Sequence, residues 1–363
     1  MSALLVRRWT NEEWLANEAP WAALQARSSA DRLFLSWEWL TLWWRCYGST
    51  LGRTPDILAF YRGADLVGLA PLYHRRVLRG GLLLAHSVQV IGLSWRDPEP
   101  LISEYLDVIA AREDLDEVRR ACAQVLLEQP SWSELVIGFT AVADRWRDAF
   151  APPVSSTQRY VRNTDRCVSY QADLSEGFGP YLRTLGQSTR RSVWNLRRRL
   201  ASLGEVRVEQ LRDNEIEEGF ADLNRLHALR WRRPAFTGKR LSFHTSLARL
   251  LVARGELAFS RLSIGGEVVS VLYDIRREQR QYNLKMGFDP AFSVRVSLGL
   301  IHLGYAMEAA AAEQITVYDF LAGPGRTSDY KRHLSQVRRD LSCVQILRGP
   351  FLPSLYRWRD RAR

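Results

Sequence analysis

The sequence predicts an α/β protein made of two similar halves, each a mixed, mostly antiparallel sheet flanked by helices. Two observations lead to this prediction. Short apolar runs bounded by glycine turns alternate with longer amphipathic runs, which is typical of strands and helices in one chain. The order of these runs is largely repeated after a polar segment at 150–165 that contains a Pro-Pro pair. We therefore expect a domain at 1–150, a linker and connecting strand at 151–179, a second domain at 180–347 and a tail at 348–363.

The first half begins with helical patterns and continues with strands. Ser36 is a suitable N-cap for the second helix, which stops near Gly48. Gly63-Ala64 divides two apolar runs and predicts a hairpin. Ten of the 13 tryptophans precede residue 150, where they either pack in the core or line a binding groove. The predicted elements are helices at 11–26, 36–47 and 114–129, and strands at 56–62, 65–75, 82–91 and 133–139.

The second half has clearer boundaries between its elements. Gly204 ends a basic helix, and Asp213 and Asn214 are suitable caps for the next one. Gly265-Gly266 is a strong hairpin turn between two apolar runs. The predicted elements are helices at 187–203, 214–231, 243–254, 298–312 and 328–337, and strands at 205–211, 256–264, 267–276, 280–287, 315–321 and 340–347.

The net charge of +11 is concentrated in two short segments. Residues 183–200 hold six arginines and no acid, and residues 346–363 hold five arginines and one aspartate. A focused positive surface attracts phosphates, nucleic acid, anionic lipid or anionic polymer. In the helix at 187–203 an apolar stripe should pack, while its arginines either stay solvated or contact phosphate. The tail at 348–363 is too short and proline-broken for a spanning helix, but it offers attraction to an anionic membrane surface.

The composition excludes several classes of protein. Hydrophobic residues make up 46% and charged residues 25%, as in a folded chain rather than a disordered or collagen-like one. The four cysteines stand far apart and show neither a metal-binding spacing nor a disulfide framework. No leader pattern is visible, and no uncharged apolar run approaches about 18 residues. We expect a cytoplasmic protein with no metal and no transmembrane segment, whose basic tail allows peripheral contact with a membrane.

One stretch of the second half resembles a known family. GFDPAF, SLGLIHLGYAMEAA, VYDFLAG and DYKR follow one another between residues 287 and 332, with RRSVWNLRRRLASLG and RLHALRW upstream. Together they closely resemble the GNAT acetyltransferases associated with cellulose and exopolysaccharide. Leu298 takes the position where that family usually has proline. The matching positions are Gly287, Phe288, Asp289, Pro290, Ser297, Gly299, Asp319, Phe320, Leu321, Gly323, Tyr330 and Lys331.

The resemblance covers about residues 180–347 and implies a GNAT acyltransferase domain there. The first half is similar to the degenerate first GNAT-like half of the same proteins. Tandem halves are also similar to those of the Fem aminoacyltransferases, which take an amino acid from tRNA to a peptidoglycan stem.

The resemblance also implies an activity. An acyl group, acetyl above all, would pass from acyl-CoA to an amine or hydroxyl of a sugar, polysaccharide precursor or small metabolite. Two alternatives stay open. One is aminoacyl transfer from aminoacyl-tRNA, with tRNA as a partner bound by the basic helix. The other is a binding subunit that keeps the fold without catalysis.

The loop at 293–299 is the candidate binding site for the donor. It enters a helix N-terminus, where free backbone N–H groups and the helix dipole favour an anion such as pyrophosphate. Arg295 would neutralise charge, while Ser297 and Leu298 begin the helix and Ser297 either caps it or contacts phosphate. Gly299 would permit close backbone approach. The simpler alternative is an ordinary capped helix start.

Three residues near the end of the second half are the candidate catalytic group. The resemblance implies that Tyr330 protonates the departing thiolate as a general acid, the alternative being a tyrosine packed on the sheet. Lys331 is one of only three lysines among 51 basic residues, so a lysine there is either required for its reach or deprotonable amine or present by chance. Asp319 ends a predicted central strand, where it would orient or deprotonate the acceptor or form a structural ion pair.

The candidate acceptor-binding residues lie beside this group. Tyr282 and Lys285 lie on one predicted strand and Asp274 on its neighbour, and all three face either the acceptor or solvent. Arg230 and Trp231 end a predicted helix. They would bind a sugar, a phosphate or an RNA end, unless they form a solvated helix terminus.

Overall fold

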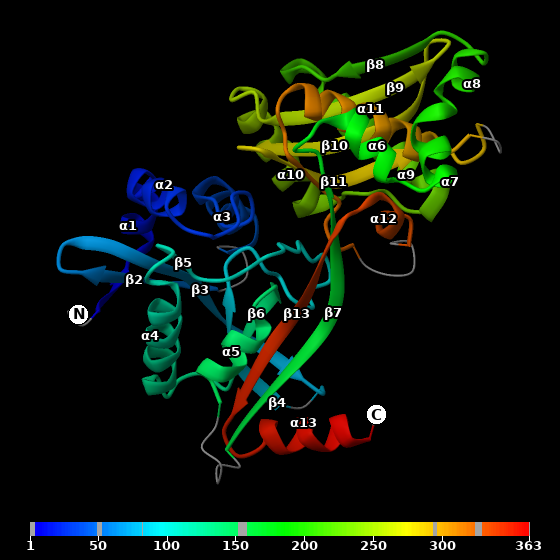
Figure 1. The fold of residues 1–363 in the computed structure, drawn as a ribbon. Helices are drawn as coiled ribbons and strands as arrows, with labels where there is room; N and C mark the ends of the chain where they lie inside the picture. The colour runs from blue at the N-terminus through cyan, green and yellow to red at the C-terminus, as the bar shows by residue number, and fades with distance from the viewer. Residues whose placement is uncertain are drawn as a thin grey trace. The chain divides into compact units, whose positions relative to one another are not determined.

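The computed structural model describes residues 4–48, 53–81, 83–151, 158–292, 296–323 and 329–362. The chain forms two units, whose elements are labelled in Figure 1. Unit 1 comprises Met1–Cys167 with Asp340–Arg363, and unit 2 comprises Val168–Arg339. The expected boundaries differ from these because the last strand, β13 (Val337–Arg348), pairs with a strand of unit 1 and so returns the end of the chain to that unit.

Unit 1 is built on a largely antiparallel sheet with the strand order β1-β2-β3-β4-β6-β13-β7, in which β4 and β6 are parallel. The predicted hairpin is confirmed as β2–β3, with Gly63 in its turn at φ +63°. The elements of this unit are β1 Leu5–Trp9, α1 Asn11–Ala16, α2 Glu18–Ala26, α3 Trp37–Trp43, β2 Thr54–Arg62, β3 Asp65–Arg79, β4 Leu83–Val90, β5 Ile109–Ala110, α4 Leu115–Glu128, β6 Glu134–Thr140, α5 Ala143–Ala149, the first part of β7 Arg159–Asp173, most of β13, and α13 Leu352–Arg361.

Unit 2 has the strand order β7-β12-β11-β10-β9-β8, in which β11 and β12 are parallel. The predicted Gly265-Gly266 hairpin is confirmed between β9 and β10, and both glycines have positive φ. The elements of this unit are the end of β7, α6 Phe178–Thr184, α7 Gln187–Arg190, α8 Arg197–Ala201, β8 Val206–Gln210, α9 Ile216–Trp231, α10 Gly238–Val252, β9 Leu257–Ile264, β10 Glu267–Arg277, β11 Arg280–Phe288, α11 Leu298–Ala312, β12 Val317–Asp319 and α12 Asp329–Leu334.

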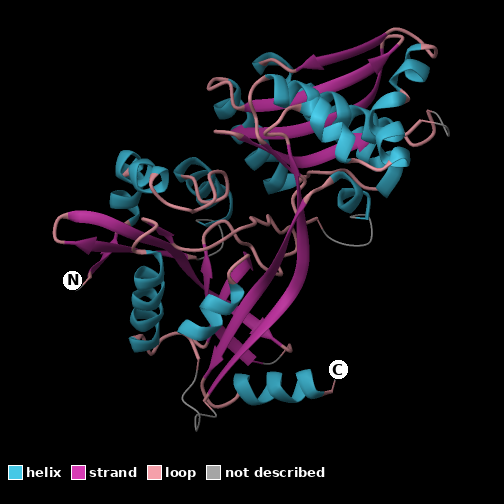
Figure 2. Cartoon of the chain, viewed as in Figure 1, coloured by secondary structure: helices cyan, strands magenta, loops and turns pink. Residues whose placement is uncertain are grey.

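The sheet of unit 2 separates two layers of helices (Figure 2). Because neighbouring side chains of a strand point to opposite faces, Leu272 and Tyr273 of β10 mark the two layers. Leu272 packs in an apolar cluster with residues of α6 and α11. The Tyr273 ring packs with Phe220 of α9 and His244 of α10. The fold class expected from the sequence, a mixed sheet flanked by helices in each half, is confirmed.

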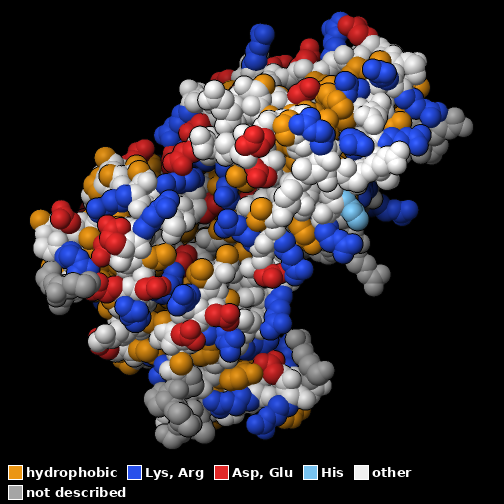
Figure 3. All heavy atoms as spheres, viewed as in Figure 1, with side chains coloured by type: hydrophobic (Ala, Val, Ile, Leu, Met, Phe, Trp, Pro, Cys, Tyr) orange, Lys and Arg blue, Asp and Glu red, His pale blue; other side chains and the backbone are white. Residues whose placement is uncertain are grey.

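The basic helix expected at 187–203 is helical but interrupted. A π-helical turn at Arg191–Asn195 joins α7 to α8. Val193 and Leu200 are buried as the apolar stripe predicts, and exposed arginines lie between them. A Cβ at Gly304 of α11 would lie 2.3 Å from the carbonyl oxygen of Val193, so the close crossing of these helices requires glycine. Figure 3 shows Lys and Arg side chains over this region.

Several elements differ from the predicted ones. The helix expected at 11–26 is two helices divided at Asn17, and β7 begins inside the segment expected to be a linker. The strand β1 and the helices α5, α6 and α13 were not predicted. These elements are short, and a short run gives too few repeats for a periodicity to show.

The basic tail forms α13 on unit 1. Pro353 lies in its first turn, where a missing N–H group costs no helical hydrogen bond. Leu352 and Tyr356 pack against side chains of β3 and β4. Phe351, just before the helix, and Trp358 are each 70% exposed. No helix among the described residues is long and apolar enough to cross a membrane, and attraction of the tail to an anionic membrane surface stays a prediction.

Candidate functional site

Two parallel strands of unit 2 pair briefly and then part. Residues 280–282 of β11 pair with residues 317–319 of β12, where β12 ends. β11 continues to Phe288, and no described strand pairs with this edge beyond Tyr282. Backbone N–H and C=O groups on that edge are therefore available to a ligand.

A buried carboxylate fixes the point where the strands part. Asp274 of β10 accepts hydrogen bonds from Gln281 Nε2 and Asn283 Nδ2, each at 2.7 Å, and from the Tyr318 hydroxyl at 2.5 Å. These donors belong to β11 and β12, so one side chain ties three strands together. Burial raises the pKa of Asp274 to about 6, against the hydrogen bonds, which lower it.

The N-terminus of α11 lies against the free end of β11. A Cβ at Gly299 would lie 2.9 Å from the Phe288 ring and 3.0 Å from Met286 Cε, so glycine permits this contact. Ser297 is the N-cap residue, and its side chain makes no capping hydrogen bond. The Ser297 side chain thus does not occupy the first N–H groups of the helix, and such groups suit an anion. Leu298 is buried, and Arg295 lies outside the described residues.

The turn after β12 is held by Asp319 and Lys331. Asp319 is fully buried, and its oxygens accept hydrogen bonds from Ser169, Gln171, Arg280 and the Leu321 backbone N–H. Leu321 has φ +56°, an uncommon conformation for a residue other than glycine.

Lys331 completes this turn from α12. Its Nζ donates to the carbonyl oxygens of Phe320, Leu321 and Ala322 at 2.7, 3.0 and 3.3 Å. Three ammonium hydrogens therefore meet three carbonyls, and the side chain fastens α12 to the end of β12.

Tyr330 precedes this lysine and packs at the edge of the apolar cluster beneath α11. Burial raises its pKa to about 12, Arg230 lowers it and Asp274 raises it. The phenol is therefore neutral near pH 7, and it lies within electrostatic reach of both charged groups.

A group of cations lies near the free end of β11. The Arg230 guanidinium lies 5.0 Å from the ring centres of both Trp231 and Phe288. Burial, together with the charges of Arg240, Arg233 and Lys331, lowers the pKa of Lys285 to about 8. The surroundings of Lys285 are thus strongly positive.

The predicted site residues do not all share one environment. The charge of Lys331 lowers the pKa of Lys285, and the charge of Arg230 lowers the pKa of Tyr330. Gly299 contacts the end of β11 that carries Phe288. Trp231 lies on the exposed side of this group. Tyr282 is 1% exposed and is the strand partner of Asp319 in the sheet, so its side chain lies in the protein interior next to the site.

Sequence reasoning missed several polar residues of the site. Gln281, Asn283 and Tyr318 hold Asp274, while Arg240 and His244 of α10 lie near Lys285. The alternation of Gln281 and Asn283 along β11 is a signal for one shared face. Nothing in the sequence indicates that Tyr318 reaches across β11.

Unit 1 has a similar parallel pair, but its own chain fills the adjoining space. Residues 87–89 of β4 pair with 134–136 of β6, as β11 does with β12. Beyond this pair, Tyr105 N–H donates to the Phe139 carbonyl at 2.9 Å, and Leu93 lies where a Cβ of Gly138 would be. The loop after β4 therefore runs along β6.

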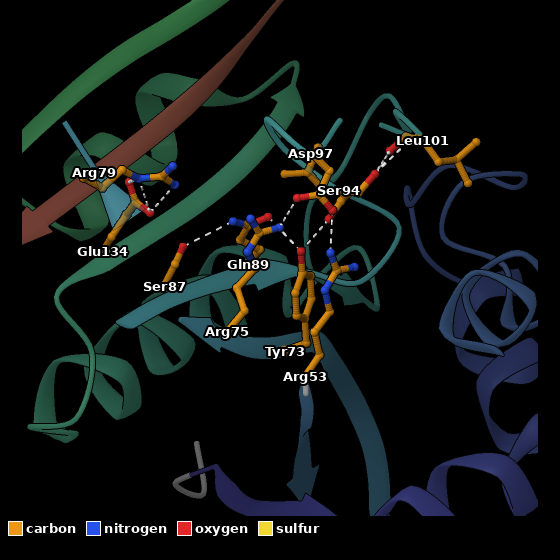
Figure 4. Close-up of polar contacts among 11 residues, drawn as sticks. Arg53, Tyr73, Arg75, Arg79, Ser87, Gln89, Ser94, Asp97, Leu101 and Glu134 are labelled. Carbon is orange, nitrogen blue, oxygen red and sulfur yellow. Dashed lines mark hydrogen bonds and ion pairs between the residues drawn. The ribbon is translucent and has the colours of Figure 1, made fainter. Parts of the chain in front are cut away.

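A polar network holds this loop in place (Figure 4). Asp97 forms ion pairs with both Arg53 and Arg75, and the Tyr73 hydroxyl lies 2.7 Å from the Leu93 carbonyl oxygen. Ser94 exchanges hydrogen bonds with Leu101 across the loop. In unit 1 a loop of the chain thus occupies the space where the parallel pair parts, which leaves unit 2 as the location of the candidate site.

A protein-family comparison matches the same part of the chain. Residues 187–332 match the family model described as the acetyltransferase (GNAT) domain. No curated protein matches the chain significantly. Among the described residues, no cluster of His, Cys, Asp and Glu is suited to a metal ion.

Solved structures of low sequence identity share the fold over most of the chain. FemX matches with 13% identity and a TM-score of 0.56, covering 93% of this chain and 96% of its own. The L-PGS of Bacillus licheniformis matches with 12% identity and a TM-score of 0.52, covering 94% and 95%. A tandem GNAT protein from the clavulanic acid biosynthesis pathway matches with 10% identity and a TM-score of 0.51, covering 96% and 99%. These similarities show a tandem GNAT-like fold.

Proposed function

We propose, from the premise that residues 187–332 form a GNAT acetyltransferase domain, that the protein transfers an acyl group from acyl-CoA to an amine or hydroxyl by direct attack. One observation carries the proposal. The free edge of β11 meets the N-terminus of α11 in unit 2, and Tyr330 packs, as Met286 of β11 does, against the apolar cluster that contains residues of α11. A thioester donor needs an anion site, a polarising donor for its carbonyl and a proton donor for its sulfur, and these three elements supply them.

The donor would bind between β11 and α11. Its phosphates suit the available N–H groups in the first turn of α11, at Ser297, Leu298 and Gly299. The pantetheine arm that joins the phosphates to the thioester then follows the unpaired edge of β11, where a backbone N–H donates to the thioester oxygen. Such a fixed donor stabilises the negative charge that develops on this oxygen during attack.

Tyr330 is the proposed general acid. The acceptor nitrogen or oxygen attacks the thioester carbon, and the tetrahedral intermediate collapses with cleavage of the C–S bond. The departing sulfur takes the phenol proton, and the proton released by the acceptor returns to the phenolate through solvent. Because burial raises the pKa of Tyr330 to about 12, the phenol keeps its proton until the sulfur leaves.

Asp319 and Lys331 act in this proposal as positioning residues. Both oxygens of Asp319 are engaged by neighbouring groups, and Lys331 is engaged by three carbonyls. Together they hold α12, and with it Tyr330, at the end of β12. The acceptor, a sugar, polysaccharide precursor or small metabolite, would approach past Arg230, Trp231 and Lys285.

A second candidate is transfer from aminoacyl-tRNA. The exposed arginines Arg191, Arg198 and Arg199 favour it, because the segment at 187–203 holds no acidic residue to neutralise them. FemX shares the fold, although at 13% identity this likeness concerns the fold alone. In this case tRNA binding should weaken steeply as salt rises, since phosphate contacts release counterions.

Thermal unfolding with candidate donors tests the choice. The protein is heated with acetyl-CoA, with free CoA or with bulk tRNA, each at low and moderate salt. A ligand present at about 100 times its Kd adds roughly 2.7 kcal/mol to the free energy of unfolding. We expect both CoA compounds to raise the Tm at either salt concentration. A salt-sensitive rise of the Tm with tRNA alone would overturn the acyl-CoA proposal. CoA binding without acyl transfer to any acceptor would instead indicate a binding subunit that lacks catalysis.

A further inference from the structure

Three cations of unit 2 have no acidic partner among the described residues. We call Lys285, Arg233 and Arg240 the cation cluster. No ion pair or side-chain hydrogen bond joins any of them to another residue in the part of the chain that the structure describes, and the Nε of Arg240 is buried without a hydrogen-bond partner there. By contrast, Arg261 lies near three carboxylates. Arg261 is thus neutralised, whereas the half-buried Lys285 and Arg240 and the exposed Arg233 are not.

The backbone brings the cluster together on the α9–α10 face of the sheet. Lys285 pairs across the strands with Tyr273, whose ring lies 5.4 Å from that of His244. Arg240 precedes His244 by one helical turn, so both lie on the same face of α10. The Arg233 carbonyl lies 2.8 Å from His227 Nδ1.

The charges around the cluster are of one sign. Burial, together with the charges of Arg240, Arg233 and Lys331, lowers the pKa of Lys285 to about 8. Burial also lowers the pKa of His244 to about 3, with Arg240 and Lys285 adding to the effect. No carboxylate contributes at either residue. Mutual repulsion of this kind is relieved when an anion binds.

The cluster lies on the opposite face of β11 from the N-terminus of α11. Met286 and Phe288 face Gly299 of α11, whereas a Cβ at Gly287 would lie 2.9 Å from the Leu223 carbonyl oxygen of α9. Lys285 therefore shares the face of Gly287, because side chains alternate along a strand. Donor phosphates on α11 would not reach the cluster's face of the sheet.

We propose that the cation cluster binds a carboxylate or phosphate group of the acceptor, so that the acceptor class is an anionic amine or alcohol. The assignment of the anion to the acceptor rests on the proposed function, whereas the anion site itself does not. Lys285 and Arg240 would each make a charge-assisted hydrogen bond to the anion, and Arg233 would add charge at the rim.

Binding of an inorganic anion tests the site without any reaction. The probe is sulfate, titrated calorimetrically into the full-length protein at low ionic strength, with and without saturating CoA. We expect one sulfate site whose affinity falls at least about tenfold in each of Lys285→Gln and Arg240→Gln, since the loss of one charge-assisted hydrogen bond costs at least the roughly 1.4 kcal/mol that corresponds to a factor of ten. Arg198→Gln, an exposed arginine of α8, is the matched control and should bind sulfate as the wild type does. Equal losses in all three variants would reduce the effect to general attraction and overturn the proposal.

Two further experiments ask whether the anion that binds the cation cluster belongs to the donor or to the acceptor. If saturating CoA abolishes sulfate binding, or if Lys285→Gln weakens CoA binding, the cluster belongs to the donor and the proposal is wrong. Acetyl transfer is then compared between phosphoethanolamine and ethanolamine, and between an amino carboxylate and its amide. We expect the anionic member of a pair to have the lower KM, and Lys285→Gln to remove that advantage. Sulfate binding in a protein that transfers no acyl group would refute the proposed function and keep the anion site.

Discussion

The Tyr318 hydroxyl donates to Asp274 Oδ2 at 2.5 Å and so joins β12 to β10 across the intervening β11. This bond crosses the sheet where β11 and β12 begin to part. It holds in place the free edge of β11, where we propose that the donor binds. The geometry of the proposed site thus depends on a buried polar contact.

Removal of that contact should cost stability. We expect Tyr318→Phe to lower the free energy of unfolding by about 1–2 kcal/mol, and Asp274→Ala to lower it by about 2–4 kcal/mol, because Gln281 and Asn283 then lose their acceptor as well. Urea unfolding measures both changes. Tyr273→Phe is the matched control, since the Tyr273 hydroxyl is buried with no hydrogen-bond partner among the described residues. A loss for Tyr273→Phe as large as that for Tyr318→Phe would contradict this account.

Tyr330→Phe should lower kcat by about 10²- to 10⁴-fold, the range typical of a missing general acid, while CoA affinity and Tm stay unchanged. Steady-state release of free thiol from acetyl-CoA, measured with a saturating acceptor, gives kcat. Tyr305→Phe, a tyrosine of α11 that packs on Trp194, should retain full activity. An undiminished kcat in Tyr330→Phe would remove the general-acid role from this residue.

Much of the fold was predictable because its signals are local. Gly63 and Gly265-Gly266 mark two hairpins, and the apolar stripe at Val193 and Leu200 marks a buried helix face. The return of β13 to unit 1 was not predictable, because pairing between β13 and β6 depends on residues about 200 positions apart. Local patterns carry no information on such distant partners.

The site was predictable in part. The motif residues Gly299, Tyr330 and Lys331 could be named from the sequence, and the structure brings them to one end of β11 and β12. Of the two roles expected for Asp319, the structure shows the structural ion pair, with Arg280. The sequence could not decide between them, because a buried carboxylate and a carboxylate facing a ligand have the same sequence context. Arg240 was missed because its importance depends on the absence of an acidic partner in the folded protein.

A buried histidine should make stability depend on pH. His302 of α11 lies between Ser260 and Ser270, with its ring nitrogens 3.0 and 2.9 Å from their hydroxyls. Burial lowers its pKa from 6.5 to about 3. Protons therefore bind the unfolded chain first, so the stabilising contribution is present above about pH 6.5 and is lost as the pH falls toward 3.

The size of this effect follows from proton linkage. At pH 5 the loss should be about 2 kcal/mol for this residue. Urea unfolding at pH 8 and pH 5 measures it, and His302→Gln should show a loss smaller by that amount. An identical pH dependence in the variant would mean that His302 is not the group that titrates.

The exposed face of α13 allows the expected attraction to membranes to be tested. Phe351 and Trp358 are exposed, and Figure 3 shows hydrophobic and basic side chains side by side over α13. Aromatic and basic groups together favour an anionic lipid surface. We expect the protein to cosediment with phosphatidylglycerol vesicles at low salt and not to bind phosphatidylcholine vesicles.

The double variant Phe351→Ser/Trp358→Ser should bind these vesicles more weakly. Leu229→Ser removes an exposed apolar side chain from α9 and is the control. Equal binding by the double variant and the wild type would exclude α13 as the membrane contact.

The central claim is that an acyl-CoA donor binds between β11 and α11. A comparison of CoA affinity between the wild type and Gly299→Val tests it most directly. A side chain at position 299 would collide with Phe288 and Met286 and move the N-terminus of α11 away from the end of β11. Calorimetric titration at moderate salt should show CoA binding to the wild type and to Tyr330→Phe, with affinity at least about tenfold lower for Gly299→Val. Equal CoA affinity in Gly299→Val, or no CoA binding by the wild type, would contradict the placement of an acyl-CoA donor between β11 and α11.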